Sequence, residues 1–101
     1  MSTNVHAVSN NNDLSLIQLT EHYDAMQIAQ LCAFAFSIPQ LYFCREYLAF
    51  DEPDVIKECQ SRLNIGLKSG IFTLTKLQKL ASEKDFYDSE EARLRLAPEP
   101  L

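Results

Sequence analysis

The stretch Ile28–Phe50 of the sequence, IAQLCAFAFSIPQLYFCREYLAF, decides the fold. It contains six of the ten aromatic residues and two of the three cysteines of the chain. From Ile28 to Phe36, apolar residues occupy every side of a helical wheel, and a helix that is apolar all round is surrounded by other elements. The pattern therefore predicts a central helix with its N-cap at Thr20 and its end near Phe36.

Four residues, Ser37-Ile38-Pro39-Gln40, interrupt this run in the pattern of a capping box. Ser37 is the expected N-cap, Gln40 reaches back from the third position, and Pro39 lies in the first turn, where its missing N–H costs nothing. We expect a second helix to about Ala49, with a hairpin or sharp bend between the two helices. The interrupted run falls short of the about 20 apolar residues that span a bilayer, so no membrane segment is expected.

Local signals predict further helices on both sides of this stretch. Leu14–Leu19 fits a helix, although its alternating pattern also fits a strand. Helix is favoured because no partner strand is visible elsewhere in the chain. Asp51 is expected to cap a helix that runs to about Lys68, with Pro53 and two acidic residues in its first turn.

The end of that helix and the start of the next one also have recognisable residues. Gly70 stands where a residue with positive φ is wanted after a helix. Thr73 is an expected N-cap, with Phe72 and Leu77 placed as a hydrophobic staple. The helix that follows Thr73 is expected to end near Glu83.

The last predicted helix, Ser89–Leu96, is opened by the capping-box pair Asp88 and Glu91. Together the patterns predict an all-α fold, a compact bundle of four to six short helices that is completed by homodimerisation. The expected organisation is a flexible polar tail at residues 1–12, a single helical domain at residues 13–96 and a loose acidic tail at residues 97–101.

The net charge of −5 is unevenly distributed. Residues 57–84 carry six bases and two acids, whereas the segments before and after them are acidic. Overall acidity argues against general nucleic-acid affinity, which needs several cations to displace counterions. It leaves room for a local basic face that binds an acidic protein or a nucleic acid. The residues expected on that face are Lys57, Arg62, Lys68, Lys76 and Lys79.

Few residues form a pattern that is typical of a catalytic, cofactor-binding or metal-binding site. Cys32, Cys44 and Cys59 lie in apolar surroundings without a C-x-x-C spacing, which is typical of buried thiols in a reducing compartment. No catalytic triad, phosphate-binding glycine loop or cluster of zinc ligands can be assembled, so we expect no enzyme activity, cofactor or metal. The alternative is a reactive thiol at Cys44, beside Arg45. The N-terminus lacks the features of a signal peptide, which favours a cytoplasmic protein.

The aromatic residues of this stretch are numerous for a chain that is long enough to form only one hydrophobic core. Two helices with broad apolar faces leave more apolar surface than a monomer usually exposes. We therefore expect a homodimer, or binding to another protein, through an aromatic surface. The residues expected in this interface are Phe34, Phe36, Tyr42, Phe43, Tyr47 and Phe50.

The basic segment SRLNIGLKSGIFTLTKLQKLA has the layout of a DNA-binding helix-turn-helix unit, although its turn and its small residue are not well placed for one. Within it, Arg62–Ile65 (RLNI) and Thr73–Ala81 (TLTKLQKLA) resemble the R-L-G-[IV] and [ST]-x-x-Q-[LM]-x-K-L-A pieces of the bacterial flagellar master regulator family, FlhD. The likeness covers only residues 62–81, the two pieces are spaced differently, and the cysteine-containing segment that follows them in that family is absent. The resemblance implies a dimeric, helical, transcription-linked regulator.

These observations predict a small non-enzymatic regulatory or adaptor protein that binds another protein and modulates it by inhibition. One alternative is a transcription-linked regulator subunit that uses the basic segment 57–84. Another is a phage-encoded inhibitor of a host complex. A cysteine enzyme centred on Cys44 is the third and weakest alternative.

Overall fold

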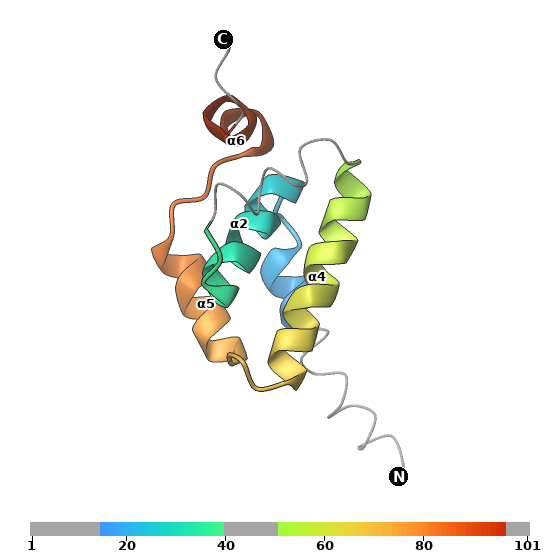
Figure 1. Ribbon diagram of the computed structural model, residues 1–101, viewed down its shortest axis with the longest axis vertical. Helices are drawn as coiled ribbons and strands as arrows, with labels where there is room; N and C mark the ends of the chain where they lie inside the picture. The colour runs from blue at the N-terminus through green and yellow to red at the C-terminus, as the bar shows by residue number, and fades with distance from the viewer. Residues whose placement is uncertain (1–14, 40–50, 97–101) are drawn as a thin grey trace.

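The computed structural model describes residues 15–39 and 51–96, and these residues form helices and no strand. The helices are residues 15–20, α2 (Ala25–Phe36), α4 (Glu52–Lys68), α5 (Leu74–Glu83) and α6 (Ser89–Leu96). α4 and α5 run in opposite directions, joined by the turn at residues 69–73, and α2 packs against both (Figure 1). The all-α prediction is confirmed for this part of the chain, and residues 15–20 are helical rather than extended.

α2 is the centre of the fold, as its all-round apolar pattern predicts. It contacts α4, α5 and α6, and nine of its twelve residues are buried. The core brings together Ile28 and Leu31 of α2, Leu63 of α4, Leu77 of α5 and Ala92 of α6. Every other labelled helix therefore packs on α2.

The start of α2 lies later than predicted. Asp24 rather than Thr20 is the N-cap: its Oδ1 accepts from the Gln27 N–H at 2.8 Å, and Gln27 Oε1 accepts from the Asp24 N–H at 3.0 Å. Thr20 belongs to the preceding helix, where its buried hydroxyl donates to the Leu16 carbonyl at 2.9 Å. Thr20 cannot form a capping box, because the residue three positions after it is Tyr23 instead of Glu or Gln.

α2 ends at Phe36, and Ser37 after it adopts the left-handed conformation with φ 57° and ψ 39°. The Ile38 N–H donates to the Ala33 carbonyl at 2.9 Å and the Ser37 N–H to the Phe34 carbonyl at 3.3 Å, which is the Schellman arrangement. The predicted N-cap role of Ser37 is therefore wrong, because an N-cap has an extended backbone. Gln40 and the predicted second helix lie outside the described residues, as do both predicted tails.

The predicted boundaries of α4 and α5 are confirmed. Pro53 lies in the first turn of α4, and Gly70 follows the helix with a φ of 74°. At the start of α5, Thr73 Oγ1 accepts from the Lys76 N–H at 3.1 Å. Asp51 occupies the N-cap position of α4, but its side chain forms no capping hydrogen bond. Local cap chemistry therefore accounts for the end of α4 and the start of α5.

The segment 84–88 connects α5 to α6 and is hydrogen-bonded to α2. Gln30 is only 1% exposed. Its Nε2 donates to the Tyr87 carbonyl and its Oε1 accepts from the Tyr87 N–H, both at 3.1 Å. Nearby, the second carboxylate oxygen of Asp24 accepts from the Ser89 N–H at 2.8 Å. Gln30 is thus a polar core residue whose amide is satisfied by a distant segment.

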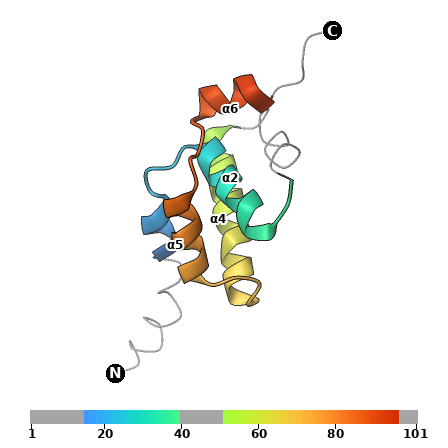
Figure 2. The same ribbon diagram turned by 90° about the vertical axis from the view of Figure 1, so that its left-hand side faces the viewer.

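α6 has the predicted bounds, and Asp88 is its predicted cap, with Oδ1 accepting from the Glu91 N–H at 2.7 Å. Among residues 89–95, only Ala92 is buried, so α6 lies on the surface of the bundle (Figure 2). No helix in residues 15–39 or 51–96 combines the length and apolar character needed to cross a bilayer.

Candidate protein-binding site

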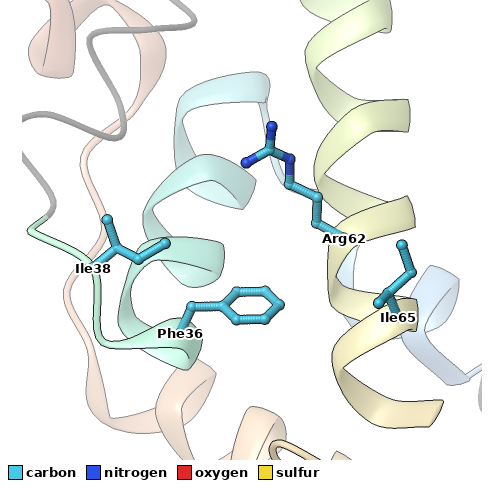
Figure 3. A pocket seen from close by; sticks show the side chains of 4 residues that line it. All are labelled: Phe36, Ile38, Arg62 and Ile65. Atoms are coloured by element: carbon cyan, nitrogen blue, oxygen red, sulfur yellow. The ribbon is translucent and has the colours of Figure 1, made fainter. Parts of the chain in front are cut away.

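A pocket of about 280 Å³ opens between the last turn of α2 and α4 (Figure 3). Phe36 and Ile38 line it on one side, and Arg62 and Ile65 of α4 line it on the other. Ile65 is 58% exposed and Ile38 is 37% exposed, so apolar side chains in the wall face solvent. Small-molecule sites occupy about 300–1,000 Å³, so this pocket lies at the lower limit of that range. Its exposed apolar wall is also suited to an apolar side chain of a protein partner.

One wall of the pocket depends on a close contact between α4 and the turn after it. Phe36 and Phe72 pack edge to face, with ring centroids 5.0 Å apart and an interplanar angle of 79°, a favourable geometry for an aromatic pair. Gly66 makes this contact possible, because a Cβ there would collide with the Phe72 ring and would lie 3.0 Å from Phe36. Gly66 therefore allows Phe72 to cover α4 and to support Phe36 in the pocket wall.

Basic residues flank the apolar wall on α4. Arg62 lies one turn before Ile65 and Lys68 lies one turn after it, and residues three apart on a helix are neighbours on its surface. Arg62 Nε donates to Glu58 Oε2 at 2.8 Å. Both side chains of this pair are about half exposed, so the pair contributes roughly 0–1 kcal/mol to stability. The pocket is apolar with a charged rim, which is the usual anatomy of a protein interface.

Phe34 and Phe36, both predicted for a partner interface, lie in different places. Phe34 stacks on Phe86 with centroids 5.8 Å apart, and Lys84 Nζ lies 4.9 Å from the centre of the Phe34 ring. Tyr23 packs against Phe86 at 5.5 Å, and burial raises the pKa of the Tyr23 hydroxyl above its usual value. Phe34 is thus partly covered by the segment 84–88, whereas Phe36 lines the pocket. The other predicted interface residues, Tyr42, Phe43, Tyr47 and Phe50, lie outside the described residues.

The five residues of the predicted basic face are exposed. They are Lys57, Arg62 and Lys68 on α4, and Lys76 and Lys79 on α5. Lys79 has an acidic neighbour on its own helix, with Nζ 3.9 Å from Glu83 Oε1. Such an exposed pair is weak, so α4 and α5 still present positive charge to an acidic partner.

Two of the three cysteines are fully buried, as predicted. These are Cys32 of α2 and Cys59 of α4, and Cys44 with its neighbour Arg45 lies outside the described residues. Within residues 15–39 and 51–96, no three side chains of His, Cys, Asp or Glu are grouped closely enough to hold a metal ion. The pocket beside Phe36 is therefore the candidate binding site on the described surface.

Comparison with known proteins adds no assignment. No family model, no curated protein and no solved structure matches the chain. The likeness of residues 62–81 to the flagellar regulator family is thus supported by no match over a longer part of the chain. The function has to be inferred from the pocket and its surroundings.

Two pocket residues, Ile38 and Ile65, were missed in the sequence patterns. Ile65 lies outside the apolar stripe of α4 that contains Cys59 and Leu63. An isoleucine on the polar side of an amphipathic helix is a signal that would have found it. Ile38 gave no such signal, because its position depends on the left-handed turn at Ser37.

Proposed function

We propose that this chain is a small non-enzymatic regulatory or adaptor protein that binds another protein and modulates it. The observation that carries the proposal is the pocket lined by Phe36, Ile38 and Ile65. Its apolar wall is exposed, Arg62 lines it, and Lys68 lies one turn after Ile65 on α4. The partner segment is expected to carry one or two apolar side chains beside an acidic residue, because that chemistry complements both the wall and the rim.

Inhibition is the expected form of modulation. A bundle of this size can cover a surface of a larger protein, and no group of the described residues is assigned to chemistry. Homodimerisation, which the apolar excess of the sequence predicts, belongs to the same proposal, since a second copy is one kind of protein partner.

The substitution Ile65→Glu should weaken partner binding at least about tenfold, because it replaces an apolar contact with a charged carboxylate that loses its hydration on binding and repels an acidic partner. The tagged full chain is used to capture partners from cells that express it naturally, and captured proteins are quantified by mass spectrometry. Ile65 is more than half exposed, so the fold should be retained, which circular dichroism checks.

The matched control is Ile17→Glu, since Ile17 is 50% exposed, lies on the 15–20 helix and is not among the residues that line the pocket. A partner captured by wild type and by Ile17→Glu, but lost with Ile65→Glu, supports the proposal. Equal capture by all three proteins would rule out this pocket as the binding site.

A further inference from the structure

The side of α2 that carries Phe34 is covered by a segment of the chain itself. Residues 84–88 have no regular secondary structure and pass along α2 between α5 and α6 (Figure 2). The Phe86 ring packs against Phe34 and against Tyr23, with centroids 5.8 Å and 5.5 Å apart. Residues two apart on a helix point about 200° apart, so this side of α2 is nearly opposite to the one that carries Phe36 and the pocket.

The covering segment contacts α2 as a bound peptide would. Gln30 forms two hydrogen bonds with the backbone of Tyr87, one to its N–H and one to its carbonyl, so it binds an extended main chain whatever the side chain. Lys84 Nζ lies 4.9 Å from the centre of the Phe34 ring, a cation–π contact. The bound pattern is therefore a cationic residue two positions before the aromatic Phe86, followed by a residue that supplies its backbone groups.

Residues 84–96, the strap, have contacts of their own that keep them together. The guanidinium carbon of Arg95 lies 4.6 Å from the centre of the Tyr87 ring, which ties α6 to the segment before it. Ala92 is the one buried residue among residues 89–95. Because a unit that buries little apolar surface has a low local stability, the strap can open while the rest of the bundle stays folded.

The hydrogen bonds that hold the strap open at little cost. The Tyr87 backbone is bonded to Gln30, and the Ser89 N–H is bonded to Asp24. An exposed bond also joins Ser89 Oγ to Glu52 of α4, at 3.3 Å. When the strap leaves, water takes up both partners of each bond, so no buried polar group stays unpaired. The strap thus resembles a ligand that is carried by its own receptor.

We propose that the side of α2 lined by Tyr23, Gln30 and Phe34 is a second protein-binding surface. It binds an extended segment of another protein that has a cationic residue two positions before an aromatic one. The strap occupies this surface until such a segment displaces it, and it thereby inhibits binding. The proposal goes beyond the proposed function and does not depend on the pocket beside Phe36.

Another protein, and not a second copy, is assigned as the occupant because of the competition from the strap. A tethered segment acts at an effective concentration of about a millimolar. An identical strap from a second copy at micromolar concentration therefore cannot displace it. A partner segment with the same pattern and a higher affinity can.

Hydrogen exchange of the full wild-type chain, followed by NMR, tests the opening and needs no variant. Three strap amides report on it, and each donates a hydrogen bond in the closed state: those of Tyr87, Ser89 and Ala92. All three should show similar protection, because the strap opens as one unit. Their protection should be at least about tenfold lower than that of the Leu63 amide in α4.

A fluorescent synthetic peptide of residues 84–96 tests binding to the uncovered surface, with anisotropy as the readout. The full-chain variant Phe86→Ala loses the aromatic contacts of its own strap but keeps the surface on α2. It should bind the peptide at least about tenfold more tightly than wild type, in which the open state is rarer. The matched control Leu94→Ala changes a strap side chain that is 77% exposed, so it should bind as wild type does. Circular dichroism checks the fold of both variants.

Changes in the peptide test the bound pattern, with the Phe86→Ala chain as receptor. A peptide with Phe86→Ala should bind at least about tenfold more weakly. A peptide methylated on the Tyr87 nitrogen should also lose affinity, because Gln30 Oε1 accepts from that N–H. Lys84→Glu should weaken binding about threefold, whereas Leu94→Ala in the peptide should change nothing.

Three outcomes would overturn the inference. They are strap amides as protected as those of α4, equal affinity of the peptide for wild type and for the Phe86→Ala chain, and a Phe86→Ala peptide that binds as the native peptide does. A wild-type dimer that excess peptide dissociates, seen by sedimentation equilibrium, would overturn the assignment to another protein in favour of a second copy. None of these outcomes changes the result expected for Ile65→Glu, which tests the proposed function separately.

Discussion

Replacing Gln30 with leucine is expected to lower the free energy of unfolding by about 2–4 kcal/mol. Leucine fills a similar volume in the core, but it leaves the Tyr87 N–H and carbonyl without the partners they have in the native fold. The segment 84–88 would lose this attachment to α2, and the hold on α6 would weaken with it. Urea unfolding followed by circular dichroism measures the loss.

The matched control for Gln30→Leu is Gln78→Leu, because Gln78 is exposed on α5 and should change stability by less than about 0.5 kcal/mol. Hydrogen exchange gives a second readout. Relative to wild type, Gln30→Leu should increase the exchange rate of the amides of residues 84–96 more than that of the amides of α4. Equal stability of the two variants would show that the Gln30–Tyr87 bonds do not hold the segment.

Replacing Gly66 with alanine is expected to lower the free energy of unfolding by about 1–3 kcal/mol, through overpacking. Helix propensity alone predicts the opposite sign, since alanine is favoured over glycine by about 1 kcal/mol inside a helix. The steric effect should win because the new methyl group would collide with the Phe72 ring, which also supports Phe36. Thermal and urea unfolding give the sign and the size of the change.

Two further variants separate this steric effect from a general destabilising effect of replacing glycine with alanine. In Gly70→Ala the added Cβ meets nothing within 4 Å, but the backbone φ is 74°, so we expect a loss of about 1–2 kcal/mol from strain alone. Adding Phe72→Leu to Gly66→Ala should recover part of the lost stability by making room for the methyl group, whereas adding it to Gly70→Ala should not. A Gly66→Ala protein as stable as wild type would contradict the packing described for the pocket wall.

The helix ends that depend on neighbouring residues could be predicted from the sequence. Thr73 caps α5, Gly70 follows α4 in the left-handed conformation, and α6 has its predicted bounds behind Asp88. Each of these signals acts within one turn of the chain, so the rest of the fold has little influence on it. The all-round apolar pattern of α2 similarly predicted its central place.

Features that depend on distant segments could not be predicted in the same way. Asp24, and not Thr20, caps α2. Its carboxylate accepts hydrogen bonds from the Gln27 N–H and from the Ser89 N–H, and Ser89 is far along the chain. Gln30 belongs to the core only because Tyr87 satisfies its amide. A helical wheel contains no information about either partner.

The pocket likewise depends on segments that are distant in sequence. Phe36 was expected in an interface because it is aromatic, and Phe34 was expected for the same reason. Only the course of the segment 84–88, which places Phe86 and Lys84 on Phe34, separates the two residues. Ile38 and Ile65 come together across two helices, and the reversal at Ser37 brings Ile38 to that position.

Protein binding is proposed to occur at the pocket beside Ile65. The most direct test is to place a photoreactive phenylalanine analogue at position 65, and in a second sample at position 17, in the full chain expressed in its natural cells. Illumination should give a discrete adduct with a protein partner, or with a second copy, from position 65 and no such adduct from position 17. Adducts of the same kind and yield from both positions, or none from position 65, would contradict the account.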